Sequence, residues 1–175
     1  QGHQPYDLSK DLTPITQATT QPYMLVVNPN LPVKNVSELI ALAQSSPKSI
    51  TYGSSGIGGF SHLAGALFES LAGVEMTHVP YKGSGVPELA SGETQLLFAL
   101  PATVNIGPRL KLLAVSAPKR LPELPTVPTA REAGFVDAEA VLWQGVCGPP
   151  NIPKPALARL TEEIRRGLAR PDRRL

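Results

Sequence analysis

The sequence predicts an α/β fold with a mostly parallel sheet flanked by helices. Short apolar runs rich in Val, Leu, Ile and Tyr alternate along the chain with stretches of helical periodicity, which is the order expected of strands joined by crossover helices. The chain has 175 residues, of which 42% are hydrophobic and 17% charged, so it can bury a core of its own. We therefore expect one α/β domain, or one domain with a fragment of another.

The strand candidates are short and rich in Val, Leu, Ile or Tyr. In chain order they are residues 23–28, 49–53, 76–80, 94–100 and 110–116. A further run, 141–147, is a candidate to return beside the first of these strands.

Helices are expected between the strands. Asn35 and Glu38 resemble a capping box, and Pro47 ends the helix that they begin. In the next helix, which Gly73 should close, apolar residues at helical spacing predict the face that lies on the sheet. These residues are Phe60, Leu63, Ala64, Leu67, Phe68 and Leu71.

Two helices are expected toward the end of the chain. A proline-rich connector, 119–129, leads into a short helix over 130–134 that Gly134 closes. The last helix, 154–169, carries an apolar stripe that must be buried against something. The residues of the stripe are Leu157, Leu160, Ile164 and Leu168.

Composition excludes several classes of protein. The net charge of +2 gives no reason to expect nucleic acid as a partner. Cys147 is the only cysteine, so neither an internal disulfide nor a multi-cysteine metal site can form. The three histidines, His3, His62 and His78, lack the spacing of metal ligands, and we expect no metal or organic cofactor. No apolar run approaches the roughly 20 residues of a membrane helix.

The segment 52–62 has the features of an anion-binding loop, because it leads from a strand through glycines and serines into a helix. The first N–H groups of a helix have no partner within it, and the helix dipole adds positive charge there. Glycines allow close approach of the backbone, and serines add hydroxyl groups: Gly53, Gly56, Gly58, Gly59, Ser54, Ser55 and Ser61. The alternative is an ordinary strand-to-helix turn with serine caps.

His62 is expected in the first turn of this helix, on its polar face and beside the loop. It could donate a hydrogen bond to an anion, or be a partly exposed histidine without a ligand. A second strand and glycine loop, 77–85, contains Lys82, which either pairs with an acidic group or is an ordinary surface lysine. Ligand crevices of open α/β sheets form beyond the carboxyl ends of the strands, so the two loops should face the same space.

Eight short motifs follow one another in a characteristic order along the chain. They are PYD (5–7), DLTPI (11–15), LVVNP (25–29), SHLAG (61–65), HVPYKG (78–83), LLAVS (112–116), LPTVPT (124–129) and IPKP (152–155). This ordered set resembles the receptors of tripartite tricarboxylate transporters, also called the Bordetella uptake gene family. The resemblance covers nearly the whole chain.

The resemblance implies an extracytoplasmic, periplasmic solute-binding protein with the two-lobed fold of type II periplasmic binding proteins. It places residues 1–20 in a hinge-crossing segment, 21–140 in lobe two, and 141–175 in a return hinge strand and a helix that belongs to lobe one. A signal peptide and about half of lobe one would precede Gln1. The last helix would then lack its partner, and we expect the isolated chain to self-associate through it.

By the same resemblance, two loops carry the ligand site. The residues on them are Ser54, Ser55, Gly56, Gly58, Gly59, Ser61, His62, Tyr81, Lys82, Gly83 and Ser84. The chain departs from the family pattern in having Ile57 where Asn is frequent, Gly59 where a hydroxyl residue is common, and Ala99 in place of an acidic residue. Each lost hydrogen bond is worth about 0.5 to 1.5 kcal/mol, enough to change ligand preference or weaken affinity several-fold.

The implied function is non-enzymatic capture of a small organic carboxylate for the membrane subunits of a transporter, with backbone donors after Ser55 receiving one carboxylate. A lone lobe should bind poorly. The alternatives are the effector domain of a transcription regulator, which a helix-turn-helix before Gln1 would reveal, and a carboxylate sensor for a signalling kinase. A serine hydrolase using Ser54 or Ser55 with His62 would lack both a Gly-x-Ser-x-Gly elbow and an orienting acid.

Overall fold

The computed structural model describes residues 7–104, 110–135 and 141–170. Contacts divide the chain into two compact units, one of Gln1–Thr20 with Trp143–Leu175 and the other of Gln21–Leu142. That the first unit crosses a hinge and belongs in part to another lobe stays a prediction.

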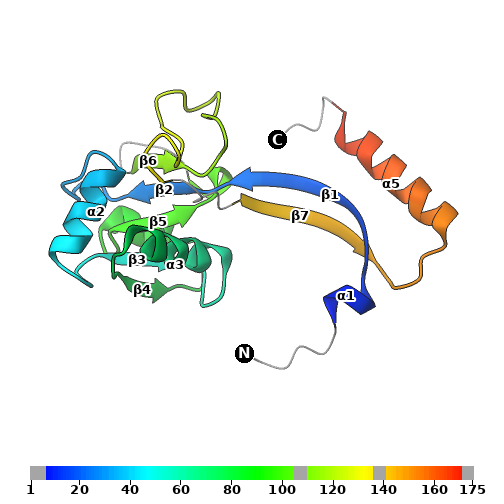
Figure 1. Cartoon of the computed structure of the whole chain (residues 1–175), viewed down its shortest axis with the longest axis horizontal. Helices are drawn as coiled ribbons and strands as arrows, with labels where there is room; N and C mark the ends of the chain where they lie inside the picture. The colour runs from blue at the N-terminus through cyan, green and yellow to red at the C-terminus, as the bar shows by residue number, and fades with distance from the viewer. Residues whose placement is uncertain (1–6, 105–109, 136–140, 171–175) are drawn as a thin grey trace. The chain divides into compact units, whose positions relative to one another are not determined.

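The second unit is built on a five-stranded sheet with the order β4-β3-β5-β2-β6 (Figure 1). Its strands are β2 (Met24–Val27), β3 (Thr51–Ser54), β4 (Thr77–Pro80), β5 (Leu96–Ala99) and β6 (Lys111–Val115). β3 is parallel to β4 and to β5, whereas β2 is antiparallel to both β5 and β6. The mostly parallel α/β sheet that the sequence predicts is confirmed, with β2 running against its neighbours.

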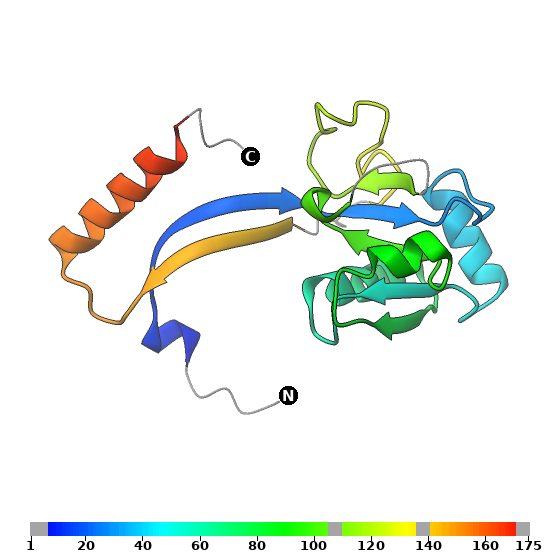
Figure 2. The same cartoon turned by 180° about the vertical axis from the view of Figure 1, so that it is seen from behind.

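Both faces of this sheet are covered. Side chains of β2 alternate between two cores, Leu25 and Val27 in one and Met24 and Val26 in the other. The first core contains α2 (Val36–Ser45) and α3 (Phe60–Ala72), and the second contains α4 (Val86–Ser91). Figure 2 shows α4 in front of the sheet on the side opposite α3.

The cap predicted for α2 is confirmed. The side chain of Asn35 accepts the N–H of Glu38 at 2.9 Å, while the Glu38 carboxylate accepts the N–H of Lys34 at 2.7 Å. Gly73 ends α3 in the left-handed conformation, with φ of 61°, as expected.

The predicted buried face of α3 is partly wrong. Its buried residues are Ser61, Ala64, Gly65 and Phe68, while Leu63 is 55% exposed. Phe60, Leu67 and Leu71 are exposed as well. The reason lies at Gly65, where an added Cβ would come within 2.3 Å of the buried Tyr52 ring. The helix therefore lies close to the sheet at its small residues and packs with Phe68, while its leucines stay partly exposed.

The short helix predicted over 130–134 is also wrong, because these residues form turns. Thr129 Oγ1 accepts the N–H of Glu132 at 3.1 Å, and the Glu132 carboxylate accepts the N–H of Thr129 at 2.9 Å. This reciprocal pair resembles a helix start, but Gly134 adopts φ of 88° before a helix can develop. A one-turn 3-10 helix, η1 (Pro101–Thr103), follows β5.

The first unit contains α1 (Leu8–Asp11), β1 (Thr13–Pro22), β7 (Val141–Gly148) and α5 (Lys154–Leu168). β7 pairs with β1 in a two-stranded sheet, so its expected place beside the strand at 23–28 is wrong. Both edges of β2 are already bonded, to β5 and β6, which leaves no room there for another strand.

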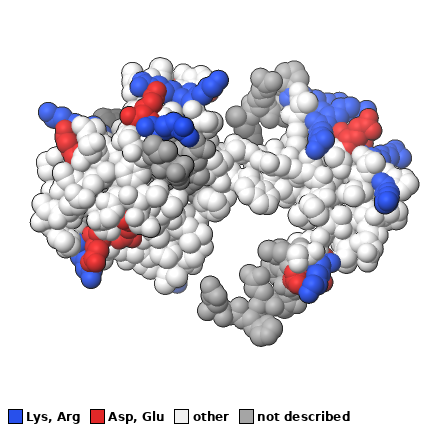
Figure 3. Space-filling model, viewed as in Figure 1, with Lys and Arg blue, Asp and Glu red and all other residues white. Residues whose placement is uncertain are grey.

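The helix predicted over 154–169 is present as α5, but none of its residues is buried. The hydroxyl of Thr161 on α5 contacts the Ile15 carbonyl of β1 at 3.2 Å. Across the residues that the structure describes, no helix combines the length and the apolar character that crossing a bilayer requires. On the face drawn in Figure 3, acidic and basic side chains lie close together.

Candidate functional site

The candidate site lies at one edge of the five-stranded sheet, where the carboxyl ends of β3, β4 and β5 meet. This follows from the parallel pairing of β3 with β4 and with β5. Because β2 is antiparallel and pairs Met24 with Ala99, the residue just before it, Tyr23, lies at the same edge. The loops after β3, β4 and β5 can therefore contribute to one site, as the sequence predicts.

A hollow of about 90 Å³ lies among these loops. Its lining consists of hydroxyl-bearing, aromatic and aliphatic residues: Tyr23, Ser55, Ser61, Ser84, Phe98, Ala99, Leu100 and Thr103. Among the residues that the structure describes, no carboxylate or basic side chain lines the hollow. Of these residues, an anion would meet neutral hydrogen-bond donors beside an apolar wall.

The start of α3 supplies backbone donors next to this hollow. The N-cap residue Gly59 makes no side-chain cap, and within the described part of the chain the N–H groups of Phe60, Ser61 and His62 have no hydrogen-bond partner. Unpaired N–H groups at a helix start, together with the helix dipole, favour an anion. Of the residues that bear them, Ser61 lines the hollow directly.

Two serines join the loop to this helix start. Ser61 Oγ accepts the N–H of Ser55 at 3.1 Å, and the two side-chain oxygens lie 3.2 Å apart, so either hydroxyl can donate to the other. Ser55 is exposed whereas Ser61 is buried, although both line the hollow.

The loop amides that follow Ser55 are largely used within the protein. Gly56 N–H donates to Ser54 Oγ at 3.1 Å, Gly58 N–H to His62 Nδ1 at 3.0 Å, and Gly59 N–H to the Gly56 carbonyl at 3.2 Å. These three amides shape the loop, in which Gly56 and Gly58 have φ of 129° and 78°. In the described stretch 56–62, the N–H groups without a partner are those of Ile57 and of the first turn of α3. That backbone donors after Ser55 receive a carboxylate stays a prediction.

Two histidines stack behind the loop. The ring centroids of His62 and His78 are 4.0 Å apart with an interplanar angle of 17°, and Tyr52 stacks on His78 at 4.9 Å. His78 Nε2 lies 2.6 Å from Ser54 Oγ. Burial lowers the pKa of His78, the neighbouring His62 lowers it further, and Glu69 opposes the shift. His62 is half-buried in this stack, not projecting from a polar helix face as the sequence suggests.

This arrangement does not suit a hydrolase. Ser54 is fully buried, so a substrate cannot reach its hydroxyl, and it contacts His78 instead of His62. No carboxylate among the described residues accepts a hydrogen bond from either histidine ring, as an orienting acid would.

The second loop contributes less than the resemblance implies. Lys82 and Gly83 are exposed and do not line the hollow. The ring of Tyr81 packs against Gly53, and its hydroxyl donates to Glu93 at 3.0 Å. Burial, then this hydrogen bond and the charge of Glu93, raise the pKa of Tyr81 to about 12. Ser84, the last residue of the expected second loop, reaches the hollow.

Of the residues expected in the site, the hollow brings together Ser55, Ser61, Ser84 and Ala99. Sequence reasoning missed Tyr23, Phe98, Leu100 and Thr103, which also line it. For Phe98, Leu100 and Thr103, the position near the end of β5 was the available signal. The antiparallel course of β2, which brings Tyr23 to this edge, has no such signal in the sequence.

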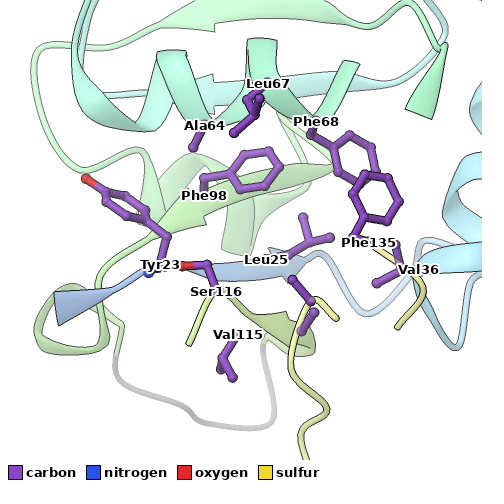
Figure 4. A pocket seen from close by; sticks show the side chains of 12 residues that line it. Tyr23, Leu25, Val36, Ala64, Leu67, Phe68, Phe98, Val115, Ser116 and Phe135 are labelled. Atoms are coloured by element: carbon purple, nitrogen blue, oxygen red, sulfur yellow. Dashed lines mark hydrogen bonds between the residues drawn. The ribbon is translucent and has the colours of Figure 1, made fainter. Parts of the chain in front are cut away.

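A second hollow of about 50 Å³ shares Tyr23 and Phe98 with the first but runs between α3 and the turn at Phe135 (Figure 4). Its walls are almost wholly apolar, and Figure 4 shows Leu67, Phe68 and Phe135 on one side of it. Because it lacks converging polar groups, it is a gap in the core packing and not the candidate site. The described residues contain no cluster of three or more His, Cys, Asp or Glu that could hold a metal ion.

Comparison with known proteins places this geometry in a family. The UPF0065 protein in the tcbD-tcbE intergenic region of Pseudomonas sp. (strain P51) is 34% identical over 174 residues, which cover 96% of this chain and 52% of that protein. The structure of R. palustris Rpa4515 with adipate has a TM-score of 0.84 and 34% identity, covering 95% of this chain and 57% of that one. The structure of MatC (Rpa3494) from Rhodopseudomonas palustris with bound malate has a TM-score of 0.81 and 29% identity, covering 96% and 59%.

The chain spans about half the length of the curated relatives it matches. Residues 2–174 match the sequence profile described as tripartite tricarboxylate transporter family receptor. That family consists of periplasmic solute-binding receptors. The match extends over nearly every residue that builds the sheet, the hollow and the start of α3, and the chain belongs to the tripartite tricarboxylate transporter receptor family.

Proposed function

We propose that this chain is part of a periplasmic solute-binding protein that captures a small organic carboxylate for a tripartite tricarboxylate-type transporter. The observation that carries the proposal is the hollow beside the start of α3, where Ser55 and Ser61 hydroxyls and unpaired first-turn N–H groups converge and no acidic side chain of the described residues is present. The adipate and malate bound by two structural neighbours support this ligand class.

The lining of the hollow also indicates that the ligand lacks an amino group. Ala99 occupies the wall where an acidic residue would accept a hydrogen bond from an ammonium group. A carboxylate without an amino group therefore fits this hollow better than an amino acid does. The role is binding without chemistry, because the hollow offers no nucleophile paired with a base. Family membership favours the receptor over a regulator or a kinase sensor.

Weak binding by this chain can be measured residue by residue. We expect millimolar adipate or malate to shift the amide NMR signals of Ser55, Ser61 and Thr103, while adipamide, which lacks the charges, leaves them in place at the same ionic strength. Ser61→Ala should weaken binding several-fold, since it removes a hydroxyl from the hollow. Ser70→Ala, on an exposed part of the same helix, is the matched control.

Calorimetric titration with mono-, di- and tricarboxylates then ranks the ligands. If no carboxylate in the panel shifts these amides or releases heat, the proposed ligand class is wrong.

A further inference from the structure

We propose that His62 and His78 are positioning residues that set the shape of the loop 55–59, and that the loop keeps this shape only while the His62 ring is neutral. The consequence for ligand affinity rests on the proposed function. The consequence for the loop itself does not, so the two can be tested separately.

Each histidine is linked by hydrogen bonds to one of the two loop glycines that have positive φ, Gly58 and Gly56. His62 Nδ1 accepts the N–H of Gly58 at 3.0 Å. His78 Nε2 contacts Ser54 Oγ at 2.6 Å, and the same Oγ accepts the N–H of Gly56 at 3.1 Å. The stacked rings therefore act on the loop through two separate hydrogen-bonded paths, one direct and one through Ser54.

The contact with Gly58 requires a neutral imidazole. A ring nitrogen accepts a hydrogen bond only when it carries no proton, and both nitrogens of a protonated ring are donors. Protonation of His62 would set an N–H against the Gly58 N–H and would break the contact. If His78 were protonated as well, two positive charges would lie in rings 4.0 Å apart.

The other titratable groups facing this pair are Tyr52 on β3 and Glu69 on α3. Burial and the Glu69 carboxylate raise the pKa of Tyr52 to about 12, so it stays uncharged. Glu69 favours a protonated His78, but burial and His62 outweigh it and lower the pKa of His78. The surroundings of His78 thus favour its neutral state.

The direction in which ligand affinity changes with pH distinguishes a positioning role of His62 from a direct hydrogen bond between His62 and the ligand. If His62 donated a hydrogen bond to the ligand, acidification would add positive charge and strengthen carboxylate binding. If His62 positions the loop, acidification releases Gly58 and weakens binding. A monocarboxylate with a pKa near 4 stays ionised down to about pH 5.5. The second carboxyl of a dicarboxylate such as adipate titrates at higher pH, so its own protonation is measured without protein and a monocarboxylate is titrated beside it as a control.

The first experiment needs no ligand. The backbone amide signal of Gly58 and the ring nitrogens of His62 are followed by NMR from pH 7.5 to 5.5. We expect Nδ1 to be unprotonated at pH 7.5, and the Gly58 amide to shift and to lose protection from hydrogen exchange along the titration curve of His62. A Gly58 amide that ignores this titration would overturn the proposal.

The second experiment measures adipate affinity over the same pH range. One hydrogen bond lost from the loop should weaken binding about 2- to 10-fold on acidification. His62→Ala should weaken it at both ends of the range. His62→Asn, which sets an amide oxygen near the position of Nδ1 and cannot be protonated, should recover affinity relative to His62→Ala and remove the pH dependence. His78→Gln is the corresponding variant for Nε2.

Stronger adipate binding at low pH, or an unaltered pH dependence in His62→Asn, would show that His62 does not act through Gly58. Failure of adipate and every other carboxylate to bind at any pH would count against the proposed function alone. The positioning role is tested separately by the pH dependence of the Gly58 amide signal.

Discussion

Gly65→Ala should destabilise the protein, although alanine is the better helix former. In an unhindered helix interior the change from glycine to alanine gains about 1 kcal/mol. Here the new Cβ would lie 2.3 Å from Cε2, 2.8 Å from Cδ2 and 2.9 Å from Cζ of Tyr52. Tyr52 is 1% exposed and its ring stacks on His78, so it cannot swing aside. Either α3 or the ring must move.

The clash should outweigh the helix-forming gain. Overpacking of a close-packed core costs about 1 to 3 kcal/mol, and contact with three ring atoms at once places Gly65→Ala at the upper end. After subtraction of about 1 kcal/mol for helix propensity, the free energy of unfolding should fall by about 2 kcal/mol. For a unit of this size the melting temperature should drop by roughly 5 to 8 °C.

Urea unfolding followed by circular dichroism, together with calorimetry, measures this change. The matched control is Gly167→Ala in α5, where an added Cβ meets no atom within 4 Å and should be neutral or slightly stabilising. In a Tyr52→Ala background the ring is gone, so Gly65→Ala should lose its cost there. A Gly65→Ala protein as stable as the parent, or the same cost in both backgrounds, would refute this account of how α3 lies on the sheet.

Three further outcomes are expected. First, folding lowers the pKa of His78 from 6.5. The contribution of neutral His78 to stability is therefore complete above pH 6.5 and is lost as the pH falls through the lower pKa of the folded state. The melting temperature should fall on acidification, and it should fall less steeply in His78→Gln. Ser55→Asp should weaken adipate binding at least tenfold in an NMR titration, because its carboxylate would occupy the helix start, whereas Ser55→Asn should retain more affinity. The chain should self-associate in size-exclusion chromatography with light scattering, and exchanging the exposed Leu160 and Leu168 of α5 for Lys should shift it toward monomer; a monomeric parent at high concentration would contradict this.

Local signals predicted most of the sheet and the helix ends correctly. The strands around Leu25 and Leu113 are continuous apolar runs because both of their faces are covered. The cap at Asn35 and the terminus at Gly73 depend on a few neighbouring residues, so the sequence shows them directly.

The predictions from sequence were wrong where contacts between residues far apart in the chain determine the structure. The face of α3 depends on Tyr52 and Gly65, which lie on different elements and meet only in the fold. β1 has a polar sequence without apolar alternation, and nothing in it signals its pairing with β7. The use of the Gly58 amide could not be foreseen, since it depends on the rotamer of His62. The region of the candidate site was predictable from strand ends, but the division between shaping amides and free amides was not.

The serine pair at the rim of the hollow has one more consequence. Because either Ser55 or Ser61 can donate to the other across 3.2 Å, rotation about two C–O bonds exchanges donor and acceptor while all heavy atoms stay in place. A ligand could thus present either an oxygen lone pair or a hydroxyl proton to this rim, and the serine hydroxyls would reorient within picoseconds to form the hydrogen bond. Such an adaptable contact lets one binding wall serve plain acids and hydroxy acids alike, leaving the choice between them to other parts of the surface.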